Sequence, residues 1–383
     1  MRHGLQTGVV RPWAQYGLPL EERTLAQALR EAGYATAIFG KWHVGHFAPE
    51  YLPTRRGFEH QYGHYNGALD YFTHIRDGGF DWHRDDKVSR DEGYSTFLIA
   101  DETVRFIREH DGRKPFFIYV PFNAVHAPHQ VPEKYKELYA HLRPPNRQTY
   151  AGMATAMDEA IGRIVGAVDA RGWRTNTLII FSSDNGGPNP GRLSSNGPLR
   201  AGKGTVYEGG VKACAFANWP GQIQSNTVVS APLHIVDWYP TLLKLAGISL
   251  EQKLPLDGRD LWPTLTANAP SPHDAILINA APKRGAIRVG DWKLVLNGHI
   301  VDTDGDDAGA EKADESQVGE KLELFNLASD PSETQNVATN NPQKVKELRA
   351  RYDALAKQQV PPKVSPKPKD FKSPAVWGEK EKK

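Results

Sequence analysis

The sequence lacks most of the features that mark disulfide-stabilised or membrane proteins. Its 383 residues include one cysteine, which excludes an intrachain disulfide framework, and no Asn-x-Ser/Thr acceptor for N-glycosylation. No apolar run approaches the roughly 20 residues that a membrane-spanning helix needs, and no signal peptide is recognisable. The net charge of +2 gives no reason to expect nucleic acid or an acidic membrane surface as a partner.

The length and the order of the expected elements predict an α/β fold with two domains. A chain of 383 residues with 39% hydrophobic residues exceeds one average domain. Up to about residue 272, amphipathic helices alternate with short apolar strands, which indicates a large, mostly parallel sheet flanked by helices. The expected helices are 25–32, 94–109, 149–171 and 235–246, and the expected strands are 35–39, 116–120 and 177–182. We therefore assign residues 1–272 to a large domain.

The pattern changes after residue 272. Four short strands follow without intervening helices, at 275–279, 286–289, 292–296 and 322–326, and a helix is expected over 342–357. They predict a smaller C-terminal α+β domain with an antiparallel sheet over 273–360. Residues 361–383 are rich in proline and lysine, so we expect a disordered tail. The acidic segment 302–307 resembles the start of a calcium loop, but its sixth and twelfth positions do not fit an EF-hand, and a solvated loop is expected.

The most informative stretch is residues 179–187, Ile-Ile-Phe-Ser-Ser-Asp-Asn-Gly-Gly. An apolar strand that ends in Asp184 and Asn185 would present two oxygen donors at the carboxyl edge of a parallel sheet, where α/β folds collect ligands. A carboxylate beside an amide oxygen suits a hard cation such as Ca²⁺ or Mg²⁺. Gly186 and Gly187 let the backbone turn away from such an ion. An isolated Asp-Asn-Gly is more often a polar turn, so the hypothesis depends on the neighbouring motifs.

Further polar motifs, like the Asp184-Asn185 segment, follow apolar runs or lie in glycine-rich loops. They are Gly-Lys-Trp-His-Val-Gly at 40–45, Leu-Pro-Thr-Arg-Arg-Gly-Phe at 52–58, Asn-Ala-Val-His-Ala-Pro at 123–128, Leu-Arg-Ala-Gly-Lys-Gly at 199–204 and Val-Tyr-Glu-Gly-Gly-Val at 206–211. Taken together and in this order, they make the chain resemble the sulfatase family over roughly its first three quarters. The chain is most similar to the arylsulfatase B type, the N-acetylgalactosamine-4-sulfatases. This resemblance implies an alkaline phosphatase-like fold for the large domain.

The resemblance also implies roles for four basic residues. Lys41 and His43 would lie beside a formylglycine hydrate, where Lys41 stabilises charge and His43 takes a proton as the sulfated intermediate collapses. His126 and Lys203 would contact the sulfate close to the leaving oxygen. We favour His126 as the general acid because its ordinary pKa lies nearer neutrality. Hydrolysis of a sulfate ester is the implied reaction.

Asp184 and Asn185 are the implied ligands of one divalent cation, with Ca²⁺ preferred and Mg²⁺ as the alternative. Each candidate taken singly also has a structural interpretation, such as a solvated lysine in a glycine-rich loop or a histidine that caps a turn. His129, His234 and Asp237 are weaker candidates, and we expect His234 to be a packed or capping residue. Glu208 either supports the Lys203 loop through its carboxylate or is structural.

The family nucleophile is a formylglycine made from Cys-x-Pro-x-Arg or Ser-x-Pro-x-Arg, and no segment here matches. Cys214 is followed by Ala-Phe-Ala, and we expect it to be a small core residue. Ser230-Ala-Pro-Leu-His234 has histidine in place of arginine and follows the expected metal strand instead of preceding it. Residues 1–8 resemble the sequence just downstream of the family motif. The expectation is therefore a chain that starts past its own nucleophile, through a misplaced start site or truncation, and that is inactive as given.

Two other functions stay open. A phosphodiesterase or phosphatase of the same superfamily would hold two metals, and Asn185 favours one metal and sulfate instead. A catalytically inactive protein that binds sulfated glycan is the other alternative. The expected partner is a sulfated carbohydrate, specifically a sulfated aminosugar in a glycosaminoglycan-like polymer such as one with N-acetylgalactosamine 4-sulfate. The resemblance suggests a periplasmic or secreted location.

Overall fold

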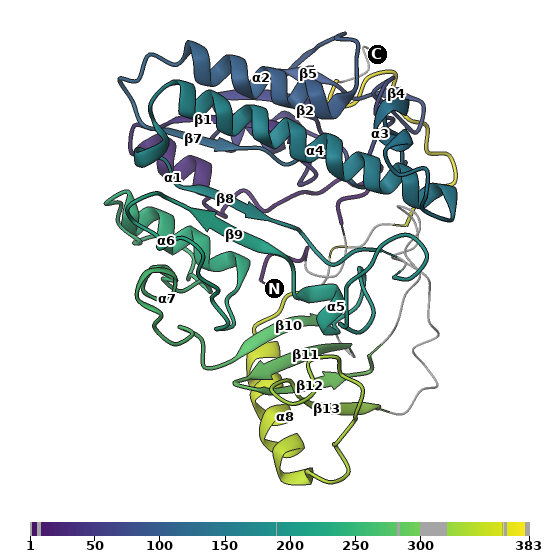
Figure 1. Ribbon diagram of the computed structural model, residues 1–383, viewed down its shortest axis with the longest axis vertical. Helices are drawn as coiled ribbons and strands as arrows, with labels where there is room; N and C mark the ends of the chain where they lie inside the picture. Colours follow the sequence, from purple (N-terminus) through teal and green to yellow (C-terminus); the bar gives the residue numbers. More distant parts are fainter. Residues whose placement is uncertain are drawn as a thin grey trace.

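The structure is a computed structural model that describes residues 2–5, 9–188, 190–281, 284–298, 320–361, 363 and 366–379. A five-stranded sheet lies at one end of the molecule beneath two long helices, and a four-stranded sheet lies at the opposite end (Figure 1). This arrangement confirms the expected α/β fold with a separate antiparallel sheet. The acidic segment 302–307 lies outside the described residues.

The large sheet is built around β1 (Ala35–Lys41), which pairs in parallel with β2 (His60–His64) on one side and with β7 (Phe116–Tyr119) on the other. Two short strands, β5 (His83–Arg84) and β6 (Lys87–Val88), extend it antiparallel beyond β2. A separate hairpin consists of β3 (Ile75–Arg76) and β4 (Gly79–Phe80). The inner five residues of β1 are buried, as expected for a central strand with an apolar sequence.

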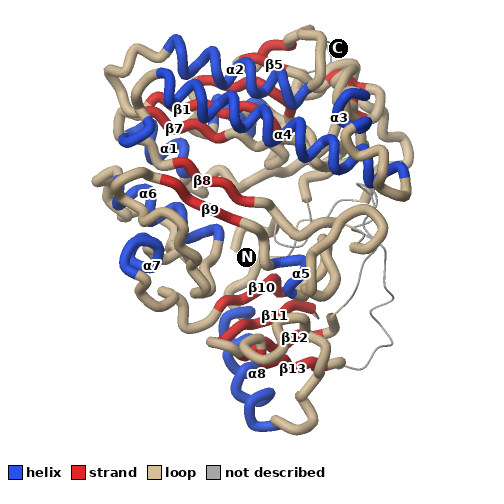
Figure 2. The backbone as a smooth tube through the Cα atoms, viewed as in Figure 1, coloured by secondary structure: helices blue, strands red, loops and turns tan. Residues whose placement is uncertain are grey.

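A second strand pair lies beside this sheet. β8 (Ile179–Ser182) pairs antiparallel with β9 (Ala215–Asn218), and Figure 2 shows the two strands between the large sheet and the C-terminal sheet. Among the described residues, β8 has no strand partner other than β9, and β7 has none other than β1. Each of these strands therefore keeps one edge without ladder hydrogen bonds.

Helices cover the large sheet because their apolar residues recur every three or four positions. The principal ones are α1 (Leu25–Glu31), α2 (Ser95–Glu109) and α4 (Pro145–Ala170). α1 begins with a capping box between Thr24 and Gln27. α2 packs against α4 through Val104 and Ile107 on one helix and Ala167 and Val168 on the other. The sequence predicted all three helices within a few residues of their ends.

The remaining helices are shorter: α3 (Glu133–Glu137), α5 (Glu208–Val211), α6 (Trp238–Leu245) and α7 (Trp262–Ala267), with 3₁₀ turns at Pro49–Tyr51, Pro53–Arg55, Arg174–Asn176 and Ile235–Asp237. The helix expected over 235–246 thus starts with a 3₁₀ turn. Pro240 lies in the first turn of α6, where the missing N–H removes no helical hydrogen bond.

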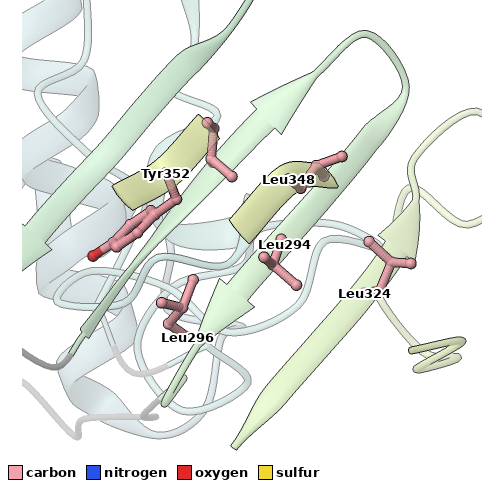
Figure 3. Packing of buried hydrophobic residues seen from close by; sticks show 6 residues of the cluster. Leu294, Leu296, Leu324, Leu348 and Tyr352 are labelled. Atoms are coloured by element: carbon pink, nitrogen blue, oxygen red, sulfur yellow. The ribbon is translucent and has the colours of Figure 1, made fainter. Parts of the chain in front are cut away.

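The C-terminal sheet is antiparallel in the order β10 (Ile276–Ala281), β11 (Arg284–Val289), β12 (Trp292–Leu296) and β13 (Leu322–Asn326). α8 (Pro342–Ala356) covers one face. Leu294, Leu296 and Leu324 point from the sheet toward Leu348 and Tyr352 of the helix (Figure 3). The sheet therefore has an apolar core of its own.

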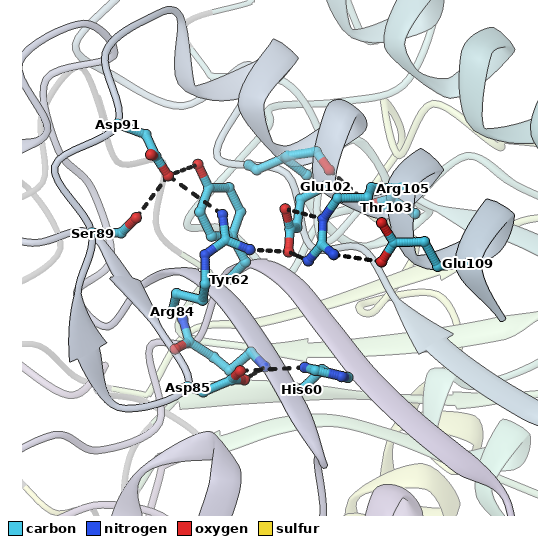
Figure 4. A network of polar contacts seen from close by, with 12 residues as sticks. His60, Tyr62, Arg84, Asp85, Ser89, Asp91, Glu102, Thr103, Arg105 and Glu109 are labelled. Atoms are coloured by element: carbon cyan, nitrogen blue, oxygen red, sulfur yellow. Dashed lines mark hydrogen bonds and ion pairs between the residues drawn. The ribbon is translucent and has the colours of Figure 1, made fainter.

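A polar network ties the outer edge of the large sheet to α2 (Figure 4). Arg84 of β5 lies over the ring of Tyr62, 4.4 Å from its centroid, and forms an ion pair with Glu102 of α2. The Tyr62 hydroxyl donates to Asp91 Oδ2 at 2.7 Å. Glu102 also pairs with Arg105 one turn along the helix. These contacts fix the β5 edge against the helical layer.

One expectation from the sequence is wrong. Cys214 is exposed and is not a core residue, because it borders β9, whose residues are mostly exposed. The disorder expected for residues 361–383 stays a prediction, although Trp377 in this segment is 3% exposed and its Nε1 donates to the carbonyl oxygen of Arg76 at 2.9 Å. No helix in the described chain is long and apolar enough to cross a membrane.

Candidate functional site

The first group of candidate residues lies where β1 and β2 end. Lys41 is the last residue of β1 and is in register with His64, the last residue of β2. Its backbone N–H donates to the carbonyl oxygen of Pro121, just after β7, at 2.8 Å. The N–H of His43 donates to the carbonyl oxygen of Tyr65 at 3.0 Å. Parallel strands thus bring Lys41 and His43 to one edge of the sheet, as expected.

The local geometry of His43 is unusual. Its φ of 55° lies in the left-handed region, which is uncommon for a residue with a Cβ and is frequent at functional sites. The ring packs directly on Gly67, where a Cβ would lie 2.3 Å from Cε1 of His43. Nε2 lies 3.1 Å from the carbonyl oxygen of Val10. Because a carbonyl only accepts, Nε2 carries the proton and Nδ1 holds the lone pair.

The surroundings of the partly buried His43 favour its neutral form. Desolvation lowers its pKa well below the usual value, and the positive charge of Lys41 lowers it further. The charges that His126 and His64 carry when protonated lower the pKa of His43 in the same direction. A neutral imidazole with a lone pair on Nδ1 is suited to accept a proton.

His126 belongs to this group. Its backbone N–H donates to the carbonyl oxygen of Asn123 at 2.9 Å, and the Tyr71 hydroxyl donates to the carbonyl oxygens of both residues. Nδ1 of His126 is 2.8 Å from the carbonyl oxygen of Ala127, so this nitrogen carries a proton. Any proton transfer between His126 and a ligand would therefore go through Nε2. The turn is fixed by Tyr71, which the sequence motif does not include.

The second group surrounds the end of β8. Asp184 is exposed and Asn185 is partly buried. Nδ2 of Asn185 donates to the carbonyl oxygen of Gly186 at 2.8 Å, so Oδ1 is the atom that remains for an ion. The backbone N–H of Lys203 donates to the carbonyl oxygen of Gly187 at 3.3 Å. The structure thus places the glycine-rich Lys203 loop directly against the segment that carries Asp184 and Asn185.

Two tyrosines are affected by the charge of Asp184. The charge of Asp184 contributes to raised pKa values of Tyr119, at the end of β7, and Tyr150, near the start of α4, although burial is the larger cause for each. Tyr119 lies two residues before Pro121, which contacts Lys41. The ring of Tyr150 also packs edge-on against His129, with centroids 5.7 Å apart. The exposed Asp184 is thus close enough to the end of β7 and the start of α4 for its charge to affect both phenols.

The donor chemistry of Asp184 and Asn185 fits a hard divalent cation. Within the residues that the structure describes, no group of three or more His, Cys, Asp and Glu side chains has metal-binding geometry. Asp184 and Asn185 supply two oxygen donors, fewer than the roughly six to eight that Ca²⁺ takes, and their role as metal ligands stays a prediction.

The weaker candidates have structural partners. Nδ1 of His234 accepts from the backbone N–H of Val236 at 3.2 Å and caps the 3₁₀ turn, which confirms the predicted capping role. Asp237 is buried and lies 2.7 Å from Nε2 of His273. His64 was not a candidate in the sequence, yet it lies beside Lys41; strand register, and not any local motif, brings it there.

Comparisons with known proteins agree with these motifs. A family model described as Sulfatase matches residues 2–248. Mouse (Mus musculus) arylsulfatase J is 35% identical over 98% of this chain and 69% of its own length. Mouse N-acetylgalactosamine-6-sulfatase is 33% identical over 65% of this chain, which spans half of that protein. The crystal structure of Ps i-CgsB superposes with a TM-score of 0.82 at 27% identity, covering 94% of this chain and 80% of that one. The same protein is known in complex with k-i-k-neocarrahexaose.

Proposed function

Because the chain belongs to the sulfatase family of hydrolases, we propose that its site binds and cleaves the sulfate ester of a sulfated sugar. The observation that carries this proposal is geometric: Lys41 and His43 come at the end of β1, and the backbone N–H of Lys41 donates to the carbonyl oxygen of Pro121, where β7 leads into the turn that contains His126. A cationic lysine beside neutral imidazole is the combination needed to neutralise a sulfate oxygen and to move protons. N-acetylgalactosamine 4-sulfate is the substrate we infer within this class.

The proposed roles follow from the protonation states. Cleavage of the ester would form a bond from a nucleophile, such as the formylglycine hydrate implied by the family, to sulfur and break the S–O bond to the sugar, so the leaving oxygen needs a proton and the sulfate oxygens need positive charge. Lys41 and Lys203 would supply the charge, and His126 would deliver the proton from Nε2 as an imidazolium that keeps its Nδ1 proton on the carbonyl oxygen of Ala127. His43, neutral with its lone pair on Nδ1, would accept the proton that is released as the sulfated intermediate breaks down.

Members of this family generally bind a divalent metal, and we propose that Asp184 and Asn185 hold it here, with Ca²⁺ preferred. Such an ion supplies Lewis-acid stabilisation of the charge on sulfate. The formylglycine implied by the family has no matching Cys-x-Pro-x-Arg or Ser-x-Pro-x-Arg segment in the printed sequence. The proposal therefore assigns binding, charge neutralisation and proton transfer to the described residues, and assigns no nucleophile among them.

Calorimetric titration of the 383-residue protein with inorganic sulfate and with N-acetylgalactosamine 4-sulfate, in the presence of Ca²⁺, tests the proposal. Replacing Lys41 or Lys203 by methionine should weaken binding of both ligands by about tenfold or more, because each removes a charge aimed at sulfate. Lys212→Met is the matched control, since Lys212 is exposed at the end of α5. Equal affinities in all variants would contradict the proposed site.

Release of sulfate from the sugar, measured in the same samples, separates the alternatives. Binding without release, from a gene shown to start at Met1, supports a sulfated-glycan binder. Hydrolysis of a phosphodiester, with two tightly held zinc ions per chain, would support a phosphodiesterase and overturn the assignment to sulfate.

A further inference from the structure

A buried ion cluster joins the C-terminal sheet to the loops of the candidate site. Nζ of Lys293, on β12, lies 2.9 Å from Oε1 of Glu208 and 2.9 Å from Oε1 of Glu333. Oε2 of Glu333 also accepts from the backbone N–H of Glu208 at 2.6 Å. The Lys293 side chain is 0% exposed, and the two glutamates are buried as well. The reaction outlined above uses none of these groups.

Glu208 begins α5, and the backbone of α5 packs directly on the segment that carries Asp184 and Asn185. The N–H of Gly186 donates to the carbonyl oxygen of Gly210 at 3.0 Å. A Cβ on Gly186 would lie 1.7 Å from the carbonyl oxygen of Gly209, so only glycine permits this approach. A displacement of α5 therefore displaces the turn after Asn185.

The Lys203 loop is part of the same packed unit. Gly209 N–H donates to the carbonyl oxygen of Arg200 at 2.9 Å. A Cβ on Gly202 would lie 2.3 Å from the carbonyl oxygen of Gly187. Arg200 is itself tied to the C-terminal sheet, through Oε1 of Glu323 at 3.3 Å and the carbonyl oxygen of Glu333 at 3.1 Å.

A buried lysine paired with two carboxylates can move little, because each charge must stay within contact distance of its partners. Each buried charge must keep its partners, because an unpaired buried charge is strongly unfavourable. Such a cluster fixes the position of α5 more tightly than apolar contacts alone, which allow sliding. Glu333 has a left-handed backbone, with φ of 52°, which indicates that surrounding contacts hold it in place.

We propose that Lys293, Glu208 and Glu333 are positioning residues: they fix α5, and through its glycine contacts they hold Asp184, Asn185 and Lys203 in place for the sulfate and its cation. The identity of the ligand in this inference rests on the proposed function. The packing of α5 against residues 184–187 and 200–204 does not depend on it. It makes the C-terminal sheet part of the site's architecture, although that sheet contributes no residue that would touch the substrate.

The test compares Lys293→Met with Lys344→Met, which removes a lysine from an exposed pair with Glu347 on α8. In Lys293→Met, amide hydrogen exchange should accelerate in peptides covering 184–187 and 200–204, and inorganic sulfate should bind about 10- to 100-fold more weakly. Lys344→Met should change neither. If wild-type protein fails to bind sulfate, the proposed function is contradicted. The positioning role is then tested by amide exchange alone, in the 184–187 and 200–204 peptides of Lys293→Met and wild type.

Glu208→Gln provides a second variant in case Lys293→Met does not fold. It keeps an oxygen acceptor for Lys293 and leaves the Lys293–Glu333 pair intact, so the fold should survive. Exchange at 184–187 should still accelerate, and sulfate affinity should fall while the circular dichroism spectrum is unchanged. A variant that is folded but merely less stable, with exchange at 184–187 and sulfate affinity equal to wild type, would overturn the proposal.

Discussion

β1 and β8 are both apolar strands that end in candidate site residues, yet their surroundings differ. β1 is paired on both edges, and its inner residues are buried. β8 is paired with β9 alone among the described strands, and none of its residues is buried. The sequence predicted β8 as a buried strand of the parallel sheet, and this prediction is wrong, because β8 pairs antiparallel with β9 and is not buried. An apolar run thus indicates that a strand can be buried. Whether it is buried depends on the strands and helices that pack around it.

The difference divides the candidate site into two halves. Lys41 and His43 follow the well-packed strand, whereas Asp184 and Asn185 follow the partly covered one. Tyr119, at the end of β7, is 49% exposed. The half that carries the candidate metal ligands depends more on α5 and the C-terminal sheet than on its own strand.

Two phenylalanines provide the largest test of this comparison. Phe39 of β1 is 1% exposed and packs on Phe106, with ring centroids 5.6 Å apart. Phe181 of β8 stacks on Phe216, which is 57% exposed, at 4.8 Å. Phe39→Ala should lower the free energy of unfolding by about 3–5 kcal/mol through a cavity in the core. Phe181→Ala should cost roughly 1 kcal/mol, because less surface is removed from water. Urea unfolding measures both, and equal losses would show that β8 is packed as tightly as β1.

Much of this difference was beyond prediction from the sequence. Long periodic segments were predicted well: the helix expected over 149–171 is α4, Pro145–Ala170. β5 and β6 have two residues each, too few for any periodicity, and they were missed. The order of the motifs indicated Lys41, His43 and His126. The positions of His64 and Tyr119 beside β1 could not be predicted, because they arise from strand pairing between distant segments. Local sequence does not encode which strand edges find partners.

The second-largest expected effect is a loss of stability at low pH. It should arise in the β1–β2 half of the site, which contains the buried His64. Burial lowers the pKa of His64 to about 3. A lowered histidine pKa means that the native state resists protonation, so its stability contribution is full above the unfolded pKa of about 6.5 and is lost as pH falls toward 3. At pH 5 the loss should be roughly 2 kcal/mol.

His64→Asn isolates this contribution. Asparagine keeps a donor near the position of Nδ1, which contacts the carbonyl oxygen of Asn66 at 2.8 Å, but it does not titrate. The free energy of unfolding of the variant should therefore fall less between pH 6.5 and pH 5 than that of wild type. Parallel pH profiles for the two proteins would show that His64 is accessible to protons in the folded state.

Hydrogen exchange should detect the smallest difference, in local opening. Amides of β1 donate into ladders with strands on both sides, whereas β8 belongs to a two-stranded pair whose residues are partly or fully exposed. Segments with few buried contacts open at lower free energy than core strands. Peptides covering 179–182 should therefore exchange at least about tenfold faster than peptides covering 35–41, which corresponds to roughly 1.4 kcal/mol of opening free energy. Equal protection in the two peptides would mean that β8 is as firmly held as β1, and the division of the site into a rigid half and a dependent half would then be wrong.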